Sequence, residues 1–167
     1  ASSDYPLRDV YKRQALAAVS EIGLIWSGLS ASDDSALRAL RRRFPEAHLV
    51  PAKAEPLKIA KAIAAFIDKQ KKLPEFALDL RGSELDVKIW RAEMQVPFGE
   101  TRAYSDIARM IGKPRAARAV GKANAACDIF PIVPCHRIHR ADGGLSGDPR
   151  WTRIQKIMIE RERNAGK

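Results

Sequence analysis

The sequence predicts two domains: a small α/β domain, made of a small sheet with helices, and a mainly α domain with a helix-turn-helix. The chain has 167 residues, enough for a small domain joined to a larger one. Short strand-like runs and amphipathic helices share the first part, whereas the second part is a series of helices separated by Gly and Pro. Pro74 and Gly82 place the boundary within residues 73–83, so we expect domains at 15–80 and 81–167.

Residues 1–14 show no clear periodicity and do not resemble the rest of the chain, so we interpret them as a non-native-looking leader. They lack an apolar stretch followed by a small-residue cleavage site. The chain also lacks the apolar run of about 18 residues that a membrane helix needs. We therefore expect a cytoplasmic protein that does not use a membrane.

The first domain begins with a predicted β-hairpin, in which residues 15–20 and 24–29 flank a turn that contains Gly23. Ser32 or Asp33 then caps a helix that runs to residue 44. The apolar face of this helix is predicted to consist of Leu37, Leu40 and Phe44.

Three further elements complete the first domain. Residues 48–50 and 76–80 are predicted as strands, and residues 55–69 as an amphipathic helix. Its apolar residues at helical spacing are Ile59, Ala60, Ile63, Phe66 and Ile67. Nothing in this domain suggests catalysis.

The second domain begins with a capped helix. Ser83 and Asp86 form a conservative version of the capping box, and Pro97 with Gly99 ends the helix. Its buried stripe is predicted to consist of Leu85, Ile89, Ala92 and Val96.

Two short helices then form a candidate helix-turn-helix. The first covers residues 104–111 and stops at Gly112. Pro114 suits the first position of the second helix, which runs to about residue 126.

The second of these helices is mostly alanine, with three cations interspersed at Arg115, Arg118 and Lys122. Small side chains let a helix approach another surface closely, while the cations meet phosphates or fill a vacated base position. The alternative is an alanine-rich helix docked in the core, which leaves its two arginines unexplained. We favour a nucleic-acid face.

The charge distribution supports that preference without establishing it. The formal net charge is +10, and residues 81–167 hold 17 Lys and Arg against 10 Asp and Glu. Residues 102–140 alone hold eight basic residues and two acidic ones. A basic half favours a polyanion such as nucleic acid, and the alternative is a solvated basic surface with no partner.

The sharpest chemical feature is the run Pro131-Ile132-Val133-Pro134-Cys135-His136-Arg137. A neighbouring His and cationic surroundings lower the pKa of a thiol, and the thiolate is the nucleophile. The alternative is a buried structural cysteine beside an incidental histidine. The other cysteine, Cys127, is interpreted as a small buried hydrophobe, and two cysteines cannot build a four-thiolate zinc site.

The string Pro134-Cys135-His136-Arg137, preceded by Arg118-Ala119-Val120-Gly121, resembles the methylated-DNA–protein-cysteine S-methyltransferase (O6-alkylguanine-DNA alkyltransferase) family. The resemblance spans residues 15–162 and includes residues 79–83, 96–101, 104 and 144–147. It implies DNA repair, in which the alkyl group of O6-alkylguanine, or of O4-alkylthymine, passes irreversibly to Cys135. Each molecule would act once.

The resemblance also implies roles for individual residues. Cys135 would be the acceptor, His136 would take its proton through a water, and Glu162 would orient that His and balance its charge. Tyr104 would hydrogen-bond the flipped guanine and supply a proton to the leaving base, and Arg118 would replace the extruded base. Further DNA contacts are expected from Arg115, Ala116, Ala117, Ala119, Lys122 and Arg137, and base-pocket contacts from Ser146, Ile138 and the main-chain carbonyls of Cys135 and Ile138.

Elementary chemistry agrees with this assignment. A methyl group on guanine O6 is inaccessible inside the duplex, so the base must flip. Displacement at the methyl carbon needs a thiolate, which Cys can supply when a His with an acid partner takes its proton. It also needs a protonated leaving group, for which a Tyr can supply the proton. We expect the partner to be double-stranded DNA that contains alkylated guanine, which would make the protein nucleoid-associated. We also expect the protein to be a monomer and to use no metal or other cofactor.

Three departures from the family pattern stand out. Cys127 occupies the place of an asparagine that normally ties the helix-turn-helix to the active-site loop, and Asn124 lies one helical turn earlier. After Gly147 the chain reads Asp148-Pro149, a good helix cap that changes the loop expected to close over the base. The first strand of the family's N-terminal part is missing or replaced by residues 1–14.

Three other functions compete with alkyl transfer. A lesion sensor would flip alkylguanine without reacting, but the sensors of the family carry another residue where this chain has Cys135. A Cys-His hydrolase would need an oxyanion hole, for which there is no signature. A plain transcription factor would leave Cys135, His136 and Tyr104 without purpose.

Overall fold

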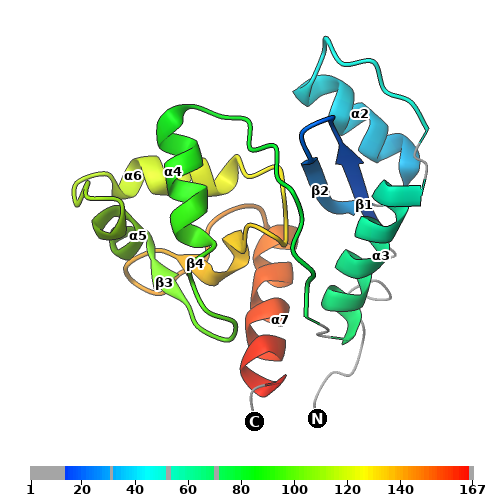
Figure 1. The fold of residues 1–167 in the computed structure, drawn as a ribbon. Coiled ribbons are helices and arrows are strands. Elements are labelled where there is room, and N and C mark those ends of the chain that lie inside the picture. The colour runs from blue at the N-terminus through cyan, green and yellow to red at the C-terminus, as the bar shows by residue number, and fades with distance from the viewer. Residues whose placement is uncertain (1–13, 31, 52–53, 70–71, 166–167) are drawn as a thin grey trace. The chain divides into compact units, whose positions relative to one another are not determined.

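The computed structural model describes residues 14–30, 32–51, 54–69 and 72–165. The chain divides into two compact units, residues 1–79 and residues 80–167, each described here by itself (Figure 1). Apart from residue 14, the leader expected at residues 1–14 and any change to a first strand there lie outside the described residues. That each unit folds independently stays a prediction.

The first unit contains a two-stranded antiparallel sheet and two helices. The hairpin of β1 (Gln14–Val19) and β2 (Leu24–Ser30) is confirmed, with Leu16 opposite Gly28. The helices are α2 (Asp33–Arg43), which Ser32 caps, and α3 (Ala54–Lys69), which packs on β1. Both helices agree with the predicted bounds to within a residue or two.

Two predictions for this unit are wrong. Residues 48–50 form no strand, because no strand among the described residues pairs with their backbone, and Val50 is exposed. The buried face of α2 consists of Ala36 and Leu40, four residues apart, whereas Leu37 is turned 100° away and is exposed.

The strand expected at residues 76–80 reduces to a single parallel bridge between Leu24 and Leu78. Leu24 donates to the Ala77 carbonyl and Asp79 donates to the Leu24 carbonyl, both at 2.8 Å. Gly23 permits this approach, because a Cβ there would lie 2.3 Å from the Ala77 oxygen.

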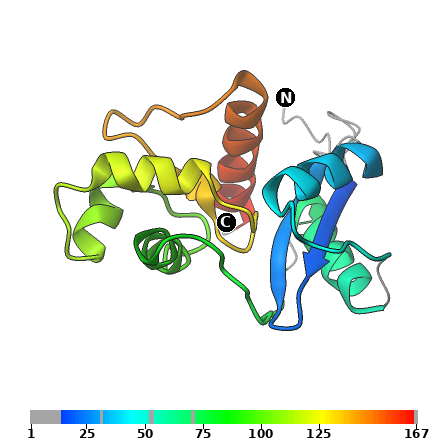
Figure 2. The same ribbon diagram turned by 90° about the horizontal axis from the view of Figure 1, so that it is seen from above.

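The second unit is mainly helical. Its helices are α4 (Glu84–Glu93), α5 (Tyr104–Met110), α6 (Ala117–Ala125), the short η1 (Cys135–Arg137) and α7 (Pro149–Ala165). Two short strands, β3 (Arg102–Ala103) and β4 (Ile138–His139), pair in parallel. α7 packs against η1, and both ribbon views show the two segments side by side (Figure 1 and Figure 2).

The capping box at the start of α4 is confirmed: Asp86 donates its backbone N–H to the Ser83 hydroxyl at 3.1 Å, and the Asp86 side chain accepts from the Ser83 backbone. The helix ends at Glu93, earlier than predicted, although Val96 is still buried.

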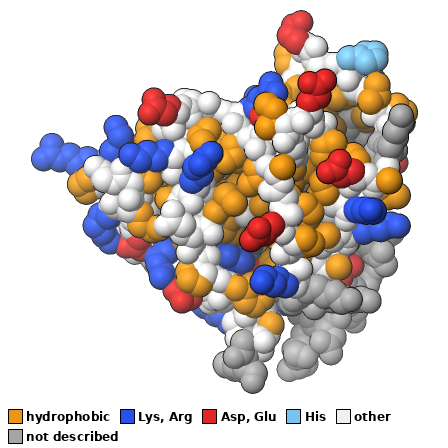
Figure 3. Space-filling view, in the orientation of Figure 1, with side chains coloured by type: hydrophobic (Ala, Val, Ile, Leu, Met, Phe, Trp, Pro, Cys, Tyr) orange, Lys and Arg blue, Asp and Glu red, His pale blue; other side chains and the backbone are white. Residues whose placement is uncertain are grey.

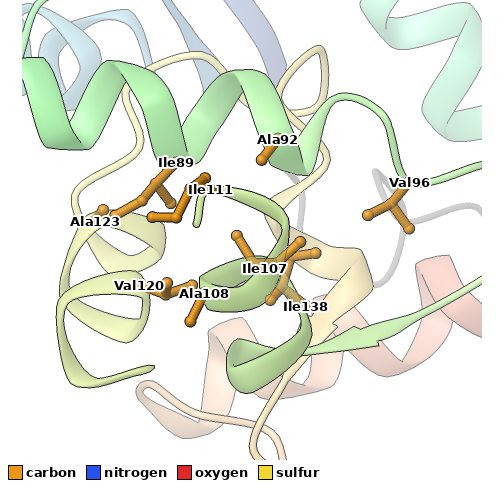
Figure 4. Packing of buried hydrophobic residues seen from close by; sticks show 9 residues of the cluster. All are labelled: Ile89, Ala92, Val96, Ile107, Ala108, Ile111, Val120, Ala123 and Ile138. Atoms are coloured by element: carbon orange, nitrogen blue, oxygen red, sulfur yellow. The ribbon is translucent and has the colours of Figure 1, made fainter. Parts of the chain in front are cut away.

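A core of nine buried residues joins α4, α5, α6 and β4 (Figure 4). Its members are Ile89, Ala92, Val96, Ile107, Ala108, Ile111, Val120, Ala123 and Ile138. The alanines let the helix backbones approach closely, so the Trp90 indole reaches the Ala123 carbonyl at 2.8 Å. This core fixes the segments on either side of Cys135.

The start of α6 differs from the prediction. Gly112 takes a positive φ of 73°, and the next four residues form a turn that Ala116 closes by donating to the Lys113 carbonyl at 2.8 Å. Pro114 therefore occupies the second position of a β-turn, which its fixed φ also suits, and α6 begins only at Ala117.

Candidate active site around Cys135

Cys135 lies at the first position of η1, and only 3% of its surface is exposed. The turn is closed by Arg137, which donates its backbone N–H to the Pro134 carbonyl at 2.8 Å. Directly after it, β4 pairs with β3, so Ile138 lies opposite Arg102. The thiol is therefore held on a tight, buried turn between two fixed segments.

The next residue, His136, is paired with a carboxylate from α7. Its Nε2 lies 2.7 Å from Oε1 of Glu162, and the two side chains are 0% and 1% exposed. Burial alone would raise the pKa of Glu162, but the hydrogen bonds from His136 and Arg137 outweigh it and lower that pKa to about 2. Glu162 is thus a carboxylate at neutral pH.

The protonation of His136 follows from this pairing. Burial lowers its pKa, and the hydrogen bond to Glu162 opposes that change only in part. A neutral ring donates from Nε2 to the carboxylate, which leaves Nδ1 as a proton acceptor. Nδ1 is buried and has no hydrogen-bond partner among the described residues. His136 is therefore suited to receive a proton.

Arg137 is bound to groups inside the protein. Its guanidinium donates to both carboxylate oxygens of Glu162, at 2.8 and 3.1 Å, and to the Val96 carbonyl at 2.8 Å. Its side chain is 11% exposed and also packs over the Phe98 ring. The contact expected between Arg137 and DNA stays a prediction.

The ionisation of Cys135 also differs from expectation. A hydrogen bond with the Cys127 thiol, burial, and the charges of Cys127 and Glu93 together raise the pKa of Cys135 well above its ordinary value. The sequence predicted a lowered pKa from His136 and Arg137. Instead, His136 is neutral and Glu162 compensates the charge of Arg137, so neither of these two neighbours stabilises the thiolate.

Asn124 ties α6 to the Cys135 turn. Its Nδ2 donates to the Cys135 carbonyl at 3.1 Å and to Oε1 of Glu93 at 3.2 Å. Cys127 occupies the usual asparagine position, and the link to the Cys135 turn is made instead by Asn124, one helical turn earlier. Cys127 was predicted to be a small buried hydrophobe. It is half-buried, and its hydrogen bond with the Cys135 thiol raises the pKa of that thiol.

The main-chain carbonyl of Cys135 has two donors already. It accepts from the Asn124 amide and from the backbone N–H of Ile138. The acceptance expected from the guanine amino group would add to these two hydrogen bonds or replace one of them, and it stays a prediction. The side chain of Ile138 is fully buried in the core, which leaves only its main chain for a ligand.

Sequence reasoning missed Glu93. It lies four residues after Ile89 on the apolar face of α4, and the structure buries it completely. A charged residue in register with a buried stripe was the available signal.

Tyr104 is the first residue of α5 and is half-buried at the edge of the core. Its ring lies against Gly121 of α6, where a Cβ would come within 3.3 Å of the Tyr104 Cε2. The absence of a side chain at Gly121 thus leaves room for the tyrosine between the two helices.

The cations of the α6 region point to solvent. Arg115, Arg118 and Lys122 are exposed, and Ala116, Ala117 and Ala119 are half-buried beside them. Lys113, Pro114, Arg115 and Ala116 line an open pocket at the turn before α6. In the second unit, Lys and Arg side chains stand out on the side where Figure 1 places α5 and α6 (Figure 3).

The loop before α7 ends in the predicted cap. The Asp148 side chain accepts from the backbone N–H groups of Arg150 and Trp151, at 2.8 and 3.0 Å, and Pro149 is the first helical residue. Ser146, half-buried, lies in this loop. The cap starts the helix that carries Glu162 to His136.

The described residues contain no group of three or more His, Cys, Asp or Glu that could hold a metal ion. No helix in the described part of the chain is long and apolar enough to cross a membrane.

A buried cysteine followed by a histidine that is paired with a glutamate, on a basic helical unit, is the arrangement that the sequence predicted for a cysteine nucleophile. Comparison with known proteins makes the class specific. Residues 84–164 match the family described as 6-O-methylguanine DNA methyltransferase, DNA binding domain. Residues 84–164 therefore belong to the O6-methylguanine-DNA methyltransferase family.

Relatives cover both units of the chain. The bifunctional transcriptional activator/DNA repair enzyme Ada of Escherichia coli is 35% identical over 94% of this chain and 44% of its own length. A methylated-DNA–protein-cysteine methyltransferase of Mycolicibacterium paratuberculosis is 54% identical over 44% of each chain. The chain spans about half the length of the curated relatives it matches.

Solved structures agree with the fold. The crystal structure of Mycobacterium tuberculosis OGT in complex with DNA superposes with a TM-score of 0.73 at 29% identity, covering 90% of this chain and 86% of that one. A second structure, of the O6-methylguanine methyltransferase of the same organism, gives a TM-score of 0.67 over 91% of this chain and 93% of that chain.

Proposed function

We propose that this protein repairs double-stranded DNA by moving the alkyl group of O6-alkylguanine, or of O4-alkylthymine, irreversibly to Cys135. The observation that carries the proposal is the buried Cys135 turn, followed by His136 and its 2.7 Å contact with Glu162. The names of the relatives, which include methylated-DNA–protein-cysteine methyltransferases, support the same reaction.

DNA binding is assigned to α5, the turn and α6, acting as a helix-turn-helix. Arg115 and Lys122 meet phosphates, and Arg118 fills the place of the extruded base. The half-buried alanines Ala116, Ala117 and Ala119 allow close approach to the groove. Flipping costs a few kcal/mol and brings the alkylated base to Cys135. The Ile138 main chain and Ser146 contribute to the base pocket.

The transfer step uses the neutral His136. The ring accepts the Cys135 proton at Nδ1 through a water, and Glu162 stabilises the imidazolium that forms. The sulfur bonds to the alkyl carbon, the bond from that carbon to the base oxygen breaks, and its electron pair goes to the base. Tyr104 supplies a proton to the departing base.

The raised pKa of Cys135 fits a single-use protein. A thiol that stays protonated until a base occupies the site is protected from unproductive alkylation. A thioether is a poor leaving group, so the reaction has no regeneration step. We further propose that the protein acts as a monomer and is associated with the nucleoid.

A lesion sensor is the competing function, and a labelled duplex separates the two. Duplex DNA with O6-methylguanine carrying a labelled methyl group is incubated with the protein, and peptides are mapped. Alkyl transfer puts the label on Cys135 and leaves Cys127 unlabelled. Tight lesion binding without any label would replace the enzyme with the sensor.

A further inference from the structure

Glu93 is an acid that the proposed reaction does not use. It ends α4, its side chain is fully buried, and its Oε1 accepts from Asn124 at 3.2 Å. Its Oε2 has no hydrogen-bond partner among the described residues. A buried carboxylate without a cation is costly, so a role is needed to explain its place beside the acceptor turn.

The contacts of Asn124 connect Glu93 to that turn. One side-chain nitrogen donates to Glu93 and to the Cys135 carbonyl, so both of its hydrogens are used. If the amide turned over, its oxygen would face the Cys135 carbonyl, which can only accept. Glu93 accepts the other amide hydrogen and so supports the orientation that holds the Cys135 carbonyl.

We propose that Glu93 is a positioning residue for alkyl transfer: through its hydrogen bond with Asn124 it fixes the turn that carries the acceptor sulfur of Cys135. This inference rests on the function proposed above and adds a residue to its site. It also assigns Asn124 as the link between them.

The charge of Glu93 matters because it faces the acceptor together with other ionisable groups. The groups around η1 are Glu93 from α4, Cys127 just after α6, and Glu162 from α7 with its partners His136 and Arg137. Burial raises the pKa of Glu93 to about 8, and the Asn124 hydrogen bond opposes that rise. An ionised Glu93 raises the pKa of Cys135, so it opposes thiolate formation.

The test is the transfer rate as a function of pH, measured with protein in excess over an O6-methylguanine duplex. Glu93→Gln keeps an acceptor for Asn124 but cannot ionise. It should transfer at close to the wild-type rate at pH 7, and the wild type should fall behind it by about tenfold at pH 9, which corresponds to one pKa unit at the thiol. Glu84→Gln, an exposed glutamate on the same helix, is the matched control and should follow the wild type.

The positioning role has a second readout. Glu93→Leu removes the acceptor for Asn124, so its transfer rate should be lower than that of Glu93→Gln at every pH. The rates of the two variants should change with pH in the same way, because neither side chain can ionise. If Glu93 acts through Asn124, the double variant Glu93→Leu, Asn124→Ala should be no slower than Asn124→Ala alone. Thermal unfolding checks that each variant is folded, and lesion binding is measured separately.

The outcomes are distinct. Identical pH profiles for the wild type and Glu93→Gln, or additive losses in the double variant, would overturn the role of Glu93 while leaving alkyl transfer intact. No transfer by the wild type at any pH would instead reject the proposed function itself.

Discussion

The Nε2 atom of His136 lies 2.7 Å from the Oε1 atom of Glu162, and both side chains are buried. The same carboxylate also receives two hydrogen bonds from Arg137, so one glutamate holds the two residues that come directly after the acceptor cysteine. A protonated His136 is therefore stabilised by an adjacent carboxylate, which is the condition for taking a proton from Cys135.

Glu162→Gln should slow transfer roughly ten- to a hundredfold, because it removes the carboxylate charge that stabilises protonated His136. It should weaken lesion binding much less, because Glu162 is not among the expected DNA contacts. The measurements are the transfer rate with limiting methylated duplex and the affinity for the same duplex, obtained by titration. Glu160→Gln, exposed on the same helix, is the control. Equal losses in rate and affinity would argue against the role of Glu162.

Glu162 also makes the free energy of unfolding depend on pH in the acid range. Its pKa is about 2 in the folded protein against about 4.5 when unfolded, so its contribution of about 3 kcal/mol is present above pH 4.5 and disappears as the pH falls through 2. Urea unfolding at pH 7 and pH 3 should therefore show a deficit for Glu162→Gln that shrinks in acid. A deficit that is constant with pH would contradict this linkage.

Cys127→Ala should lower the pKa of Cys135, because the hydrogen bond that the Cys135 thiol makes to Cys127 is the largest cause that raises it. Alkylation of Cys135 by iodoacetamide at pH 8 should then be faster than in the wild type. Cys127→Ser, which can still hydrogen-bond, should lie between the two. Unchanged reactivity in Cys127→Ala would show that burial alone controls the thiol.

DNA affinity should depend strongly on salt and little on sequence, since we propose that the exposed cations of α6 meet phosphates. Lys122→Ala should reduce the slope of log affinity against log salt by about 1. Lys88→Ala, exposed on α4, is the control and should leave the slope unchanged. An unchanged slope for Lys122→Ala would place the DNA elsewhere.

Local signals predicted most of the elements. Caps at Ser32, Ser83 and Asp148 set the starts of three helices because each cap is decided by a few neighbouring residues. The failures came from tertiary context: a strand at 48–50 needs a partner strand that the sequence does not reveal, and Pro114 suits a turn as well as a helix start.

The site shows the same division. The contact between His136 and Glu162 agrees with what the family resemblance implied, although the roles of both residues stay predictions. The raised pKa of Cys135, the inward placement of Arg137 and the link from Glu93 to Asn124 could not be predicted. Each depends on what surrounds a side chain after folding, which spacing along the chain does not specify.

The most direct test of the central claim is the mass of the intact protein after incubation with excess O6-methylguanine duplex. Each molecule should gain the mass of one methylene unit and then stop reacting. Cys135→Ala should gain nothing and still bind the lesion, because phosphate contacts and base flipping depend on other residues. Several turnovers per molecule, or a mass gain that survives in Cys135→Ala, would contradict the account.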